Sequence, residues 1–393
     1  MIAILKRYYN AAIGVLILIF SGLMFVTFAS ISYNGFMGDY DALALDAELN
    51  HAKNINNIQK LNYTEKPEKV AAKAIYLTSY TAGGNLDAFI KRINETDLNA
   101  VVIDIKDYTG WIAYDTDVAI INELGTENVK IDDIEAVLEK LHDNDIYTVA
   151  RMQVFQDPAL SLKKPEWTIQ NSTTGTTWKD YKGLAWLDPN SREVWDYNVL
   201  LAKDAVDKGF DEINLDYIRF PSDGPIGSAV YTHDVGREKT ETINAFFTYF
   251  AEQMKDEPAY RSADLFGMTM WHESDFNIGQ TLVGAAPHFD YVAPMVYPSH
   301  YPDGFLGLEN PADHPYTVVE TNLARGKTFL EKIASSTESI AEIRPWIQDF
   351  SLGAVYTADM VKEQLRAAEE HDTSGYFVWN ASNRYSYDAF IDN

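Results

Sequence analysis

The stretch GFDEINLDYIRFP, residues 209–221, follows a helical pattern and is predicted to be a β-strand that ends at a Pro-Ser-Asp-Gly turn. Ile213 and Leu215 lie on one face, because side chains alternate along a strand. The opposite face is polar and carries Glu212, Asn214 and Asp216. Helices cover both faces of a parallel sheet, so a parallel strand cannot turn its polar face to water. We therefore expect this face to point into a functional site.

From residue 73 onward, strand-like runs alternate with helical patterns, as is typical of βαβ units. Eight such runs over residues 73–393 predict fold class α/β and a (β/α)8 TIM barrel. An open doubly wound sheet is the alternative, but no Gly-rich phosphate loop of the right spacing follows the first strand. The expected strands are 74–80, 100–106, 147–155, 212–220, 265–271, 291–297, 343–350 and 375–380.

The N-terminal part of the chain differs from the rest. Residues 11–31, AAIGVLILIFSGLMFVTFASI, carry no charge and have about the length that crosses a bilayer. Lys6 and Arg7 precede them, which predicts a single membrane helix in segment 1–31 with the remaining chain outside the cytoplasm. A cleaved signal peptide is the alternative. Residues 32–72 are polar and are expected to be a linker.

Composition excludes several functions. The chain of 393 residues has no cysteine, which excludes disulfides, thiolate metal sites and cysteine nucleophiles. Its net charge of −26 argues against a nucleic-acid partner, because such binding needs Lys and Arg to displace counterions. The histidines show no HxxxH or HExxH spacing, which argues against a histidine metal site, and no GxSxG motif of a nucleophilic serine is present. We expect neither a metal nor a cofactor.

Polar side chains gather on one face of the predicted strands. In a barrel, inward side chains at the carboxyl ends of the strands build the site, and a purely structural interior would be filled by branched aliphatic residues. A structural ion-pair network is the alternative explanation for this face. When the more aliphatic face is assigned outward, the inward face carries Asp104, Lys106, Arg151, Gln153, Asn214, Asp216, Thr269, Trp271, Glu273, Met295, Tyr297, Arg344, Trp346, Gln348, Val378 and Asn380.

Two long loops are expected at the same end of the barrel. Residues 156–190 contain three Trp and a Tyr, and residues 298–315 contain His300, Tyr301 and several Gly and Pro. Long aromatic loops form binding walls, or they pack down on the barrel. Flat aromatic faces with polar neighbours suit the apolar faces of pyranose rings.

The chain resembles the putative glycoside hydrolase domain family, a TIM-barrel family, over roughly residues 73–390. The blocks that carry the resemblance are NLDYIRFP (214–221), FGMTMWHESDFNIGQ (266–280), DYVAPMVYPSHY (290–301), RPWIQDF (344–350) and GYFVWNASNRYS (375–386). It implies a glycosidase-like barrel. Chitinase-type barrels are more distantly similar, but Ile218 stands where their catalytic Glu would be, so that mechanism is not carried over.

Glycoside hydrolysis needs two carboxyl groups, one ionised and one protonated. We predict Asp216 as the nucleophile or charge stabiliser and Glu273 as the general acid/base, with Asp104 as the second choice of acid and Asp107 behind it. Carboxyl groups on neighbouring strands would suit a retaining enzyme. The residues predicted to bind substrate are Lys106, Arg151, Gln153, Asn214, Arg219, Trp271, Tyr297, His300, Tyr301, Arg344, Trp346, Gln348, Trp379 and Asn380.

The predicted site residues and the N-terminal segment together favour a membrane-anchored, extracytoplasmic glycoside hydrolase that acts on a cell-wall or extracellular polysaccharide. The alternative is a non-catalytic glycan-binding or envelope-structural barrel. The acid pair favours the enzyme, because binding alone does not require two acids. A barrel lyase or transglycosidase would use the same residues.

Overall fold

The computed structural model describes residues 66–337 and 339–391. Within them no helix is long and apolar enough to cross a membrane. The predicted membrane helix and residues 32–65 of the predicted linker lie outside the described residues. The first strand begins at Ala72.

The sheet of the described region is a closed parallel barrel. Its strand order is β10-β11-β1-β2-β3-β5-β7-β8-β9, and β10 also pairs with β8, which closes the ring. This closure confirms the predicted (β/α)8 barrel and excludes the open doubly wound sheet. The strands are β1 (Ala72–Leu77), β2 (Ala100–Lys106), β3 (Tyr147–Gln153), β5 (Glu212–Asp216), β7 (Tyr260–Phe266), β8 (Tyr291–Met295), β9 (Glu342–Ile343), β10 (Trp346–Gln348) and β11 (Gly375–Trp379).

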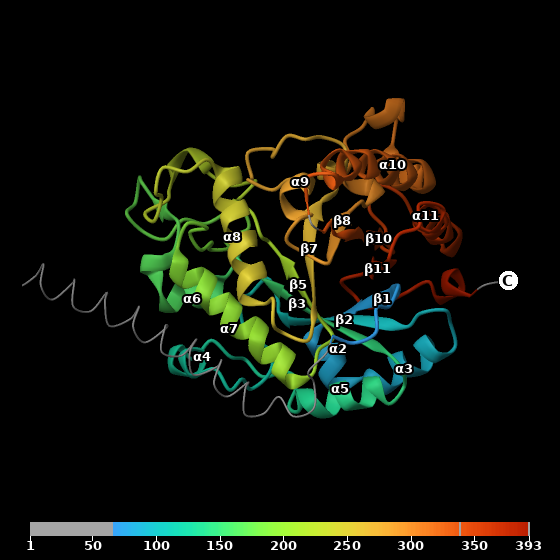
Figure 1. The fold of residues 1–393 in the computed structure, drawn as a ribbon, viewed down its shortest axis with the longest axis horizontal. Coiled ribbons are helices and arrows are strands. Elements are labelled where there is room, and N and C mark those ends of the chain that lie inside the picture. The colour runs from blue at the N-terminus through green and yellow to red at the C-terminus, as the bar shows by residue number, and fades with distance from the viewer. Residues whose placement is uncertain (1–65, 338, 392–393) are drawn as a thin grey trace, which may run out of the picture. The chain divides into compact units, whose positions relative to one another are not determined.

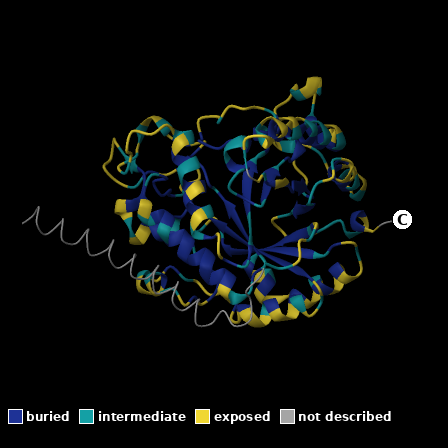
Figure 2. Ribbon diagram, viewed as in Figure 1, coloured by how far each residue is buried: buried dark blue, intermediate teal, exposed yellow. Residues whose placement is uncertain are grey.

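Helices surround the strands (Figure 1), and their outward faces are exposed while the strands are buried (Figure 2). The helices are α2 (Ser79–Gly84), α3 (Leu86–Asn94), α4 (Ala119–Leu124), α5 (Ile134–His142), α6 (Pro158–Lys163), α7 (Arg192–Lys208), α8 (Lys239–Gln253), α9 (Leu282–Ala285), α10 (Pro315–Ala334) and α11 (Ala358–Glu370).

The longest buried helix, α7, leads into the stretch that decided the fold. The Ser191 side chain accepts a hydrogen bond from the N–H of Val194 and so caps its first turn. Gly209 ends the helix with a φ of 113°, a left-handed conformation that glycine adopts without strain. β5 then begins at Glu212 and ends at Asp216, so the strand is shorter than the predicted 212–220.

The seventh barrel position consists of two strands, β9 and β10, because Pro345 between them has no N–H to donate to the sheet. Arg344 precedes this break and lies at the N-terminal end of the barrel. Its Nη1 lies 2.6 Å from Oε2 of Glu212, and neither side chain is exposed. Arg344 also donates to the carbonyl oxygens of Ser374 and Val70. It therefore closes the barrel bottom, and the prediction that it binds substrate is wrong.

Two local features reverse the predicted direction of side chains. In β2 the register with β3 shifts between Asp104 and Lys106, so Asp104 pairs with Arg151 whereas Lys106 pairs with Met152. This bulge turns Lys106 out of the barrel toward α7. In β11 the residues that fill the barrel interior are Phe377 and Trp379, not Val378 and Asn380, because the interior here is aromatic rather than aliphatic.

The largest correction concerns the fifth barrel strand. The prediction was 265–271, but β7 spans Tyr260–Phe266 and the chain then leaves the sheet in a 3-10 turn at Gly267–Met270. The pairing of Asn214 with Ser262 fixes this register. The inward side chains are consequently Ser262 and Asp264, rather than the predicted Thr269 and Trp271.

Candidate active site

A cavity of about 890 Å³ opens at the carboxyl ends of the barrel strands. This is the end at which barrel enzymes carry their active sites, and the volume lies within the usual range for a small-molecule or sugar site. The predicted site residues that line it are Asp104, Asp107, Arg151, Gln153, Asp216, Arg219, Tyr297, His300, Tyr301, Trp346 and Trp379.

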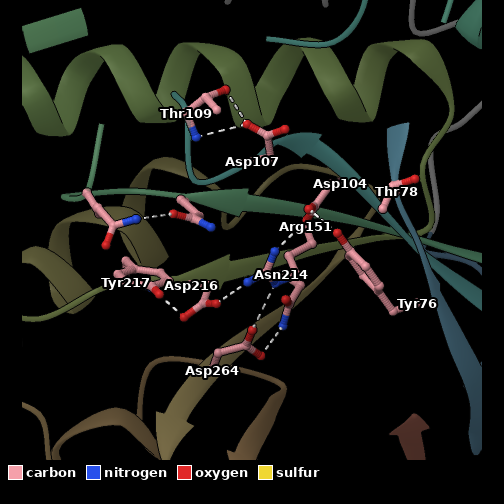
Figure 3. Close-up of polar contacts among 12 residues, drawn as sticks. Tyr76, Thr78, Asp104, Asp107, Thr109, Arg151, Asn214, Asp216, Tyr217 and Asp264 are labelled. Atoms are coloured by element: carbon pink, nitrogen blue, oxygen red, sulfur yellow. Dashed lines mark hydrogen bonds and ion pairs between the residues drawn. The ribbon is translucent and has the colours of Figure 1, made fainter. Parts of the chain in front are cut away.

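Arg151 lies at the centre of the cavity floor and contacts three carboxyl groups from three strands (Figure 3). Its Nη1 donates to Asp104 and its Nη2 donates to Asp216. Its Nε lies 3.5 Å from Oδ2 of Asp264. Burial lowers the pKa of Arg151, but the three neighbouring carboxylates raise it by more, so the guanidinium stays cationic. One guanidinium therefore brings three aspartates together.

Asp264 projects from β7 and was missed by the sequence prediction. Its Oδ1 accepts hydrogen bonds from Asn214 Nδ2 at 2.8 Å and Trp346 Nε1 at 2.7 Å. Its Oδ2 has no hydrogen-bond partner among the described residues. Burial, followed by the charge of Asp216, raises the pKa of Asp264 to about 8. Burial thus favours the neutral, protonated form of Asp264, although its Oδ2 also lies within ion-pair distance of the Arg151 Nε.

Asp216 lies at the end of β5 beside Asp264. Its Oδ1 accepts the backbone N–H of Tyr217 at 2.6 Å, and its Oδ2 accepts a hydrogen bond from Arg151. Both donors suit the ionised form of a carboxyl group. Tyr217 has a φ of 52°, which is unusual for a bulky residue. This local strain at the strand end holds the Tyr217 N–H on the Asp216 carboxylate.

Asp104 is the third carboxyl group of the cavity floor. Tyr76 donates its hydroxyl hydrogen to Oδ2 of Asp104 at 2.5 Å, and Arg151 donates to Oδ1. Burial raises the pKa of Asp104. Both Asp104 oxygens are therefore occupied, whereas Asp264 keeps one free oxygen. This difference favours Asp264 over Asp104 as the acid.

The structure does not bring Glu273 to the other carboxyl groups. Its side chain is 58% exposed and forms an ion pair with Lys332 on α10. It lies outside the cavity because the chain has left the sheet after Phe266. Trp271 does not line the cavity either, and it packs against Phe305 and the guanidinium of Arg325. Glu273 is therefore not placed to act with Asp216, whereas Asp264 lies in the cavity.

Several other predicted site residues support the cavity without lining it. Lys106 is fully buried, and its Nζ bonds Asp157 at 3.0 Å and Asn198 at 2.8 Å. Asn214 lies beneath the site and donates to Ser262 as well as to Asp264. Lys106 therefore holds a loop in place, and Asn214 orients the acid.

Gln348 and Asn380 form hydrogen bonds with backbone groups outside the cavity. Gln348 accepts the N–H of Ser299 at 3.2 Å and donates to the carbonyl oxygen of Phe350. Asn380 donates to the carbonyl oxygens of Asp349 and Arg384. Both residues hold loops at the barrel rim, and neither is among the residues that line the cavity.

No group of three or more His, Asp or Glu side chains in residues 66–337 and 339–391 is placed to hold a metal ion. Arg151 occupies the centre of the one cluster of aspartates described above. The absence of a metal and of a cofactor stays a prediction.

Replacing Arg151 with Leu is expected to lower the free energy of unfolding by about 3–5 kcal/mol, because it leaves buried carboxylates without their cation. Urea denaturation measures this loss. Arg366→Leu is the matched control, since Arg366 lies on the exposed face of α11 in an i,i+4 pair and should change stability by no more than about 0.5 kcal/mol. Equal stability of the Arg151 variant and the wild type would contradict the central role of this residue.

Comparison with known proteins settles the family. The family described as "Putative glycosyl hydrolase domain" matches residues 74–385, which span the barrel. The chain belongs to this family. This description agrees with the glycoside hydrolase class that the resemblance in its sequence blocks implied. Among curated protein sequences no significant match is found.

Three solved structures are similar to this chain, and the two with TM-scores above 0.5 agree with its fold. A hypothetical protein from Ruminiclostridium thermocellum ATCC 27405 is 40% identical over 48% of this chain and 96% of its own, with a TM-score of 0.45. The PgaB (BpsB) glycoside hydrolase domain from Bordetella bronchiseptica is 13% identical over 82% of this chain and 99% of its own, with a TM-score of 0.57. A GH20 exo beta-N-acetylglucosaminidase from Vibrio harveyi is 7% identical over 79% of this chain and 50% of its own, with a TM-score of 0.51.

Proposed function

We propose that the protein hydrolyses a glycosidic bond with Asp264 as general acid and Asp216 as the ionised partner. The observation that carries the proposal is the pair itself: two buried aspartates from neighbouring strands contact one guanidinium, and burial raises the pKa of one of them, Asp264. Two carboxyl groups of opposite ionisation are what glycoside hydrolysis requires.

The reaction assigns one task to each group. Asp264 gives its Oδ2 proton to the glycosidic oxygen as the bond to the anomeric carbon breaks. Asp216 either attacks the anomeric carbon and is then displaced by water, whose proton returns to Asp264, or takes a proton from the water that attacks the anomeric carbon. In both cases water supplies the new hydroxyl group, and the leaving sugar departs as an alcohol. The first course retains the anomeric configuration and the second inverts it.

The proposed substrate is an oligo- or polysaccharide of a cell wall or extracellular matrix. Aromatic side chains in the cavity wall, including Trp379, Tyr297 and Phe266, support a sugar ligand. The uncharged run 11–31 behind Lys6 and Arg7 supports a membrane tether with the barrel outside the cytoplasm.

One observation favours a second candidate, a glycan-binding barrel without catalysis. Arg151 contacts Asp104, Asp216 and Asp264 and, in a purely structural role, would hold all three carboxyl groups inactive. Against this role, Oδ2 of Asp264 keeps no hydrogen-bond partner among the described residues.

A glycan screen separates the two candidates. The full-length chain, taken from the membrane fraction in detergent, is incubated with neutral, amino and acidic polysaccharides, and new reducing ends are measured. We expect release by the wild type and by the control Glu273→Gln, and none by the double variant Asp216→Asn, Asp264→Asn. Retention on a glycan without release would support the binding protein instead. Recovery of the full-length chain in the soluble fraction would refute the tether.

A further inference from the structure

The cavity extends across the barrel mouth. On one side it is lined by Tyr80 and Tyr108, which follow β1 and β2. On the other side it is lined by Gly267 and Tyr301, which follow β7 and β8. In the closed order of strands, β1 and β2 lie opposite β7 and β8. The cavity thus has lining residues on both sides of the floor that carries Asp216 and Asp264.

Two tyrosine rings at the first end are exposed although they line the cavity. Tyr80 is 71% exposed and Tyr108 is 57% exposed. The Tyr80 ring is held in place, because the Lys130 ammonium lies 5.0 Å from its centroid. Asp107, a residue of the cavity wall, bonds the same ammonium at 3.0 Å. A fixed, solvent-facing aromatic ring beside a cavity offers a platform for the apolar face of a sugar.

The opposite end has an unused hydrogen-bonding group. Tyr301 is 5% exposed, and its hydroxyl has no partner among the described residues. Gly267 lets the Tyr301 hydroxyl approach the backbone closely: a Cβ there would lie 2.6 Å from the Tyr301 hydroxyl and 2.4 Å from the carbonyl oxygen of Met295. A buried hydroxyl without a partner is costly unless a ligand supplies one.

We infer that the cavity binds a glycan chain of three or more sugars that crosses the barrel mouth and is cut at an internal bond. Tyr80 and Tyr108 form an outer subsite on which a distal sugar stacks, and the Tyr301 hydroxyl bonds a sugar hydroxyl at the opposite end. Asp216 and Asp264 lie between the two ends, at β5 and β7. The internal cut rests on the proposed hydrolysis, whereas the subsites require binding alone.

The test measures binding against chain length. The full-length Asp264→Asn chain is titrated with N-acetylglucosamine, glucosamine and glucose oligomers of one to six sugars. We expect affinity to rise up to at least three sugars in one series. Adding Tyr80→Ala or Tyr108→Ala should weaken hexamer binding about tenfold and leave the disaccharide unchanged, because the lost stacking concerns a distal sugar. Tyr80→Phe keeps the ring and should bind like the parent.

Tyr181→Ala is the matched control, since Tyr181 is 78% exposed but does not line the cavity. Equal affinity for one and six sugars in every series, or no binding to any, would overturn the subsites. Rising affinity with chain length, but no hydrolysis of the hexamer by the wild type, would support the subsites and reject the proposed function. If the wild type does hydrolyse the hexamer, early products of two to four sugars would support the internal cut. Stepwise release of single sugars would overturn it.

Discussion

Asp264→Asn is expected to lower kcat by about 10³- to 10⁴-fold on a natural glycan, because an amide cannot give up the proton that the leaving oxygen needs. The pH profile tests the same role. Burial raises the pKa of Asp264 to about 8, so the acid is protonated below pH 8 and loses its proton above it. Wild-type kcat/KM, which reports groups of the free enzyme, should therefore fall about tenfold per pH unit above pH 8, and the variant should lose this limb.

The leaving group supplies the control for this role. A 2,4-dinitrophenyl glycoside departs without protonation, so Asp264→Asn should hydrolyse it far better, relative to the wild type, than it hydrolyses the natural glycan. Glu273→Gln, which also removes a carboxyl group, should match the wild type on both substrates because Glu273 lies outside the cavity. Equal losses on the two substrates would move the acid role to Asp104.

Asp216→Asn is expected to lower kcat by at least about 10³-fold on both the natural glycan and the 2,4-dinitrophenyl glycoside. Whether Asp216 attacks the anomeric carbon itself or activates the water that does, its task is the same for both leaving groups. This insensitivity to the leaving group distinguishes Asp216 from Asp264. Circular dichroism confirms that the variant is folded, since Asp216 also pairs with Arg151. A loss below tenfold would remove Asp216 from the reaction.

The configuration of the first product decides how Asp216 acts. Proton NMR of wild-type hydrolysis shows the anomer before it equilibrates. A retained anomer makes Asp216 the nucleophile, and an inverted anomer makes it the base that activates water. If Asp216 is the nucleophile, azide added to Asp216→Ala should restore activity and yield a glycosyl azide of inverted configuration.

Local patterns in the sequence were enough to predict the barrel and part of its site. Alternation along 212–216 placed Asp216 inside, and the same argument placed Asp104 and Arg151. These predictions hold because in an unbroken strand the side-chain direction follows from sequence position alone. They failed at the bulge before Lys106, where the backbone departs from regular spacing, and in β11, where the aromatic residues Phe377 and Trp379 point inward.

Asp264 was missed for a related reason. Residues 260–266 contain Arg261, Ser262 and Asp264 and look polar, whereas the apolar run 265–271 looked more like a buried strand. The choice between these registers depends on pairing with β5 and β8, which is a contact between distant parts of the chain. The same strand shift moved Glu273 out of the site.

The sequence by itself determined the βαβ rhythm, the closed barrel and the inward face of the strand that ends at Asp216, because alternation and helix periodicity are properties of neighbouring residues. Only the tertiary structure showed which carboxyl groups lie together in the cavity and which of them is proposed as the acid. The ionisation of Asp264 depends on solvent exclusion by the whole barrel and on the charges of Asp216 and Arg151, which come from other strands. Solvent exclusion and these charges act on Asp264 only after the strands have closed into the barrel.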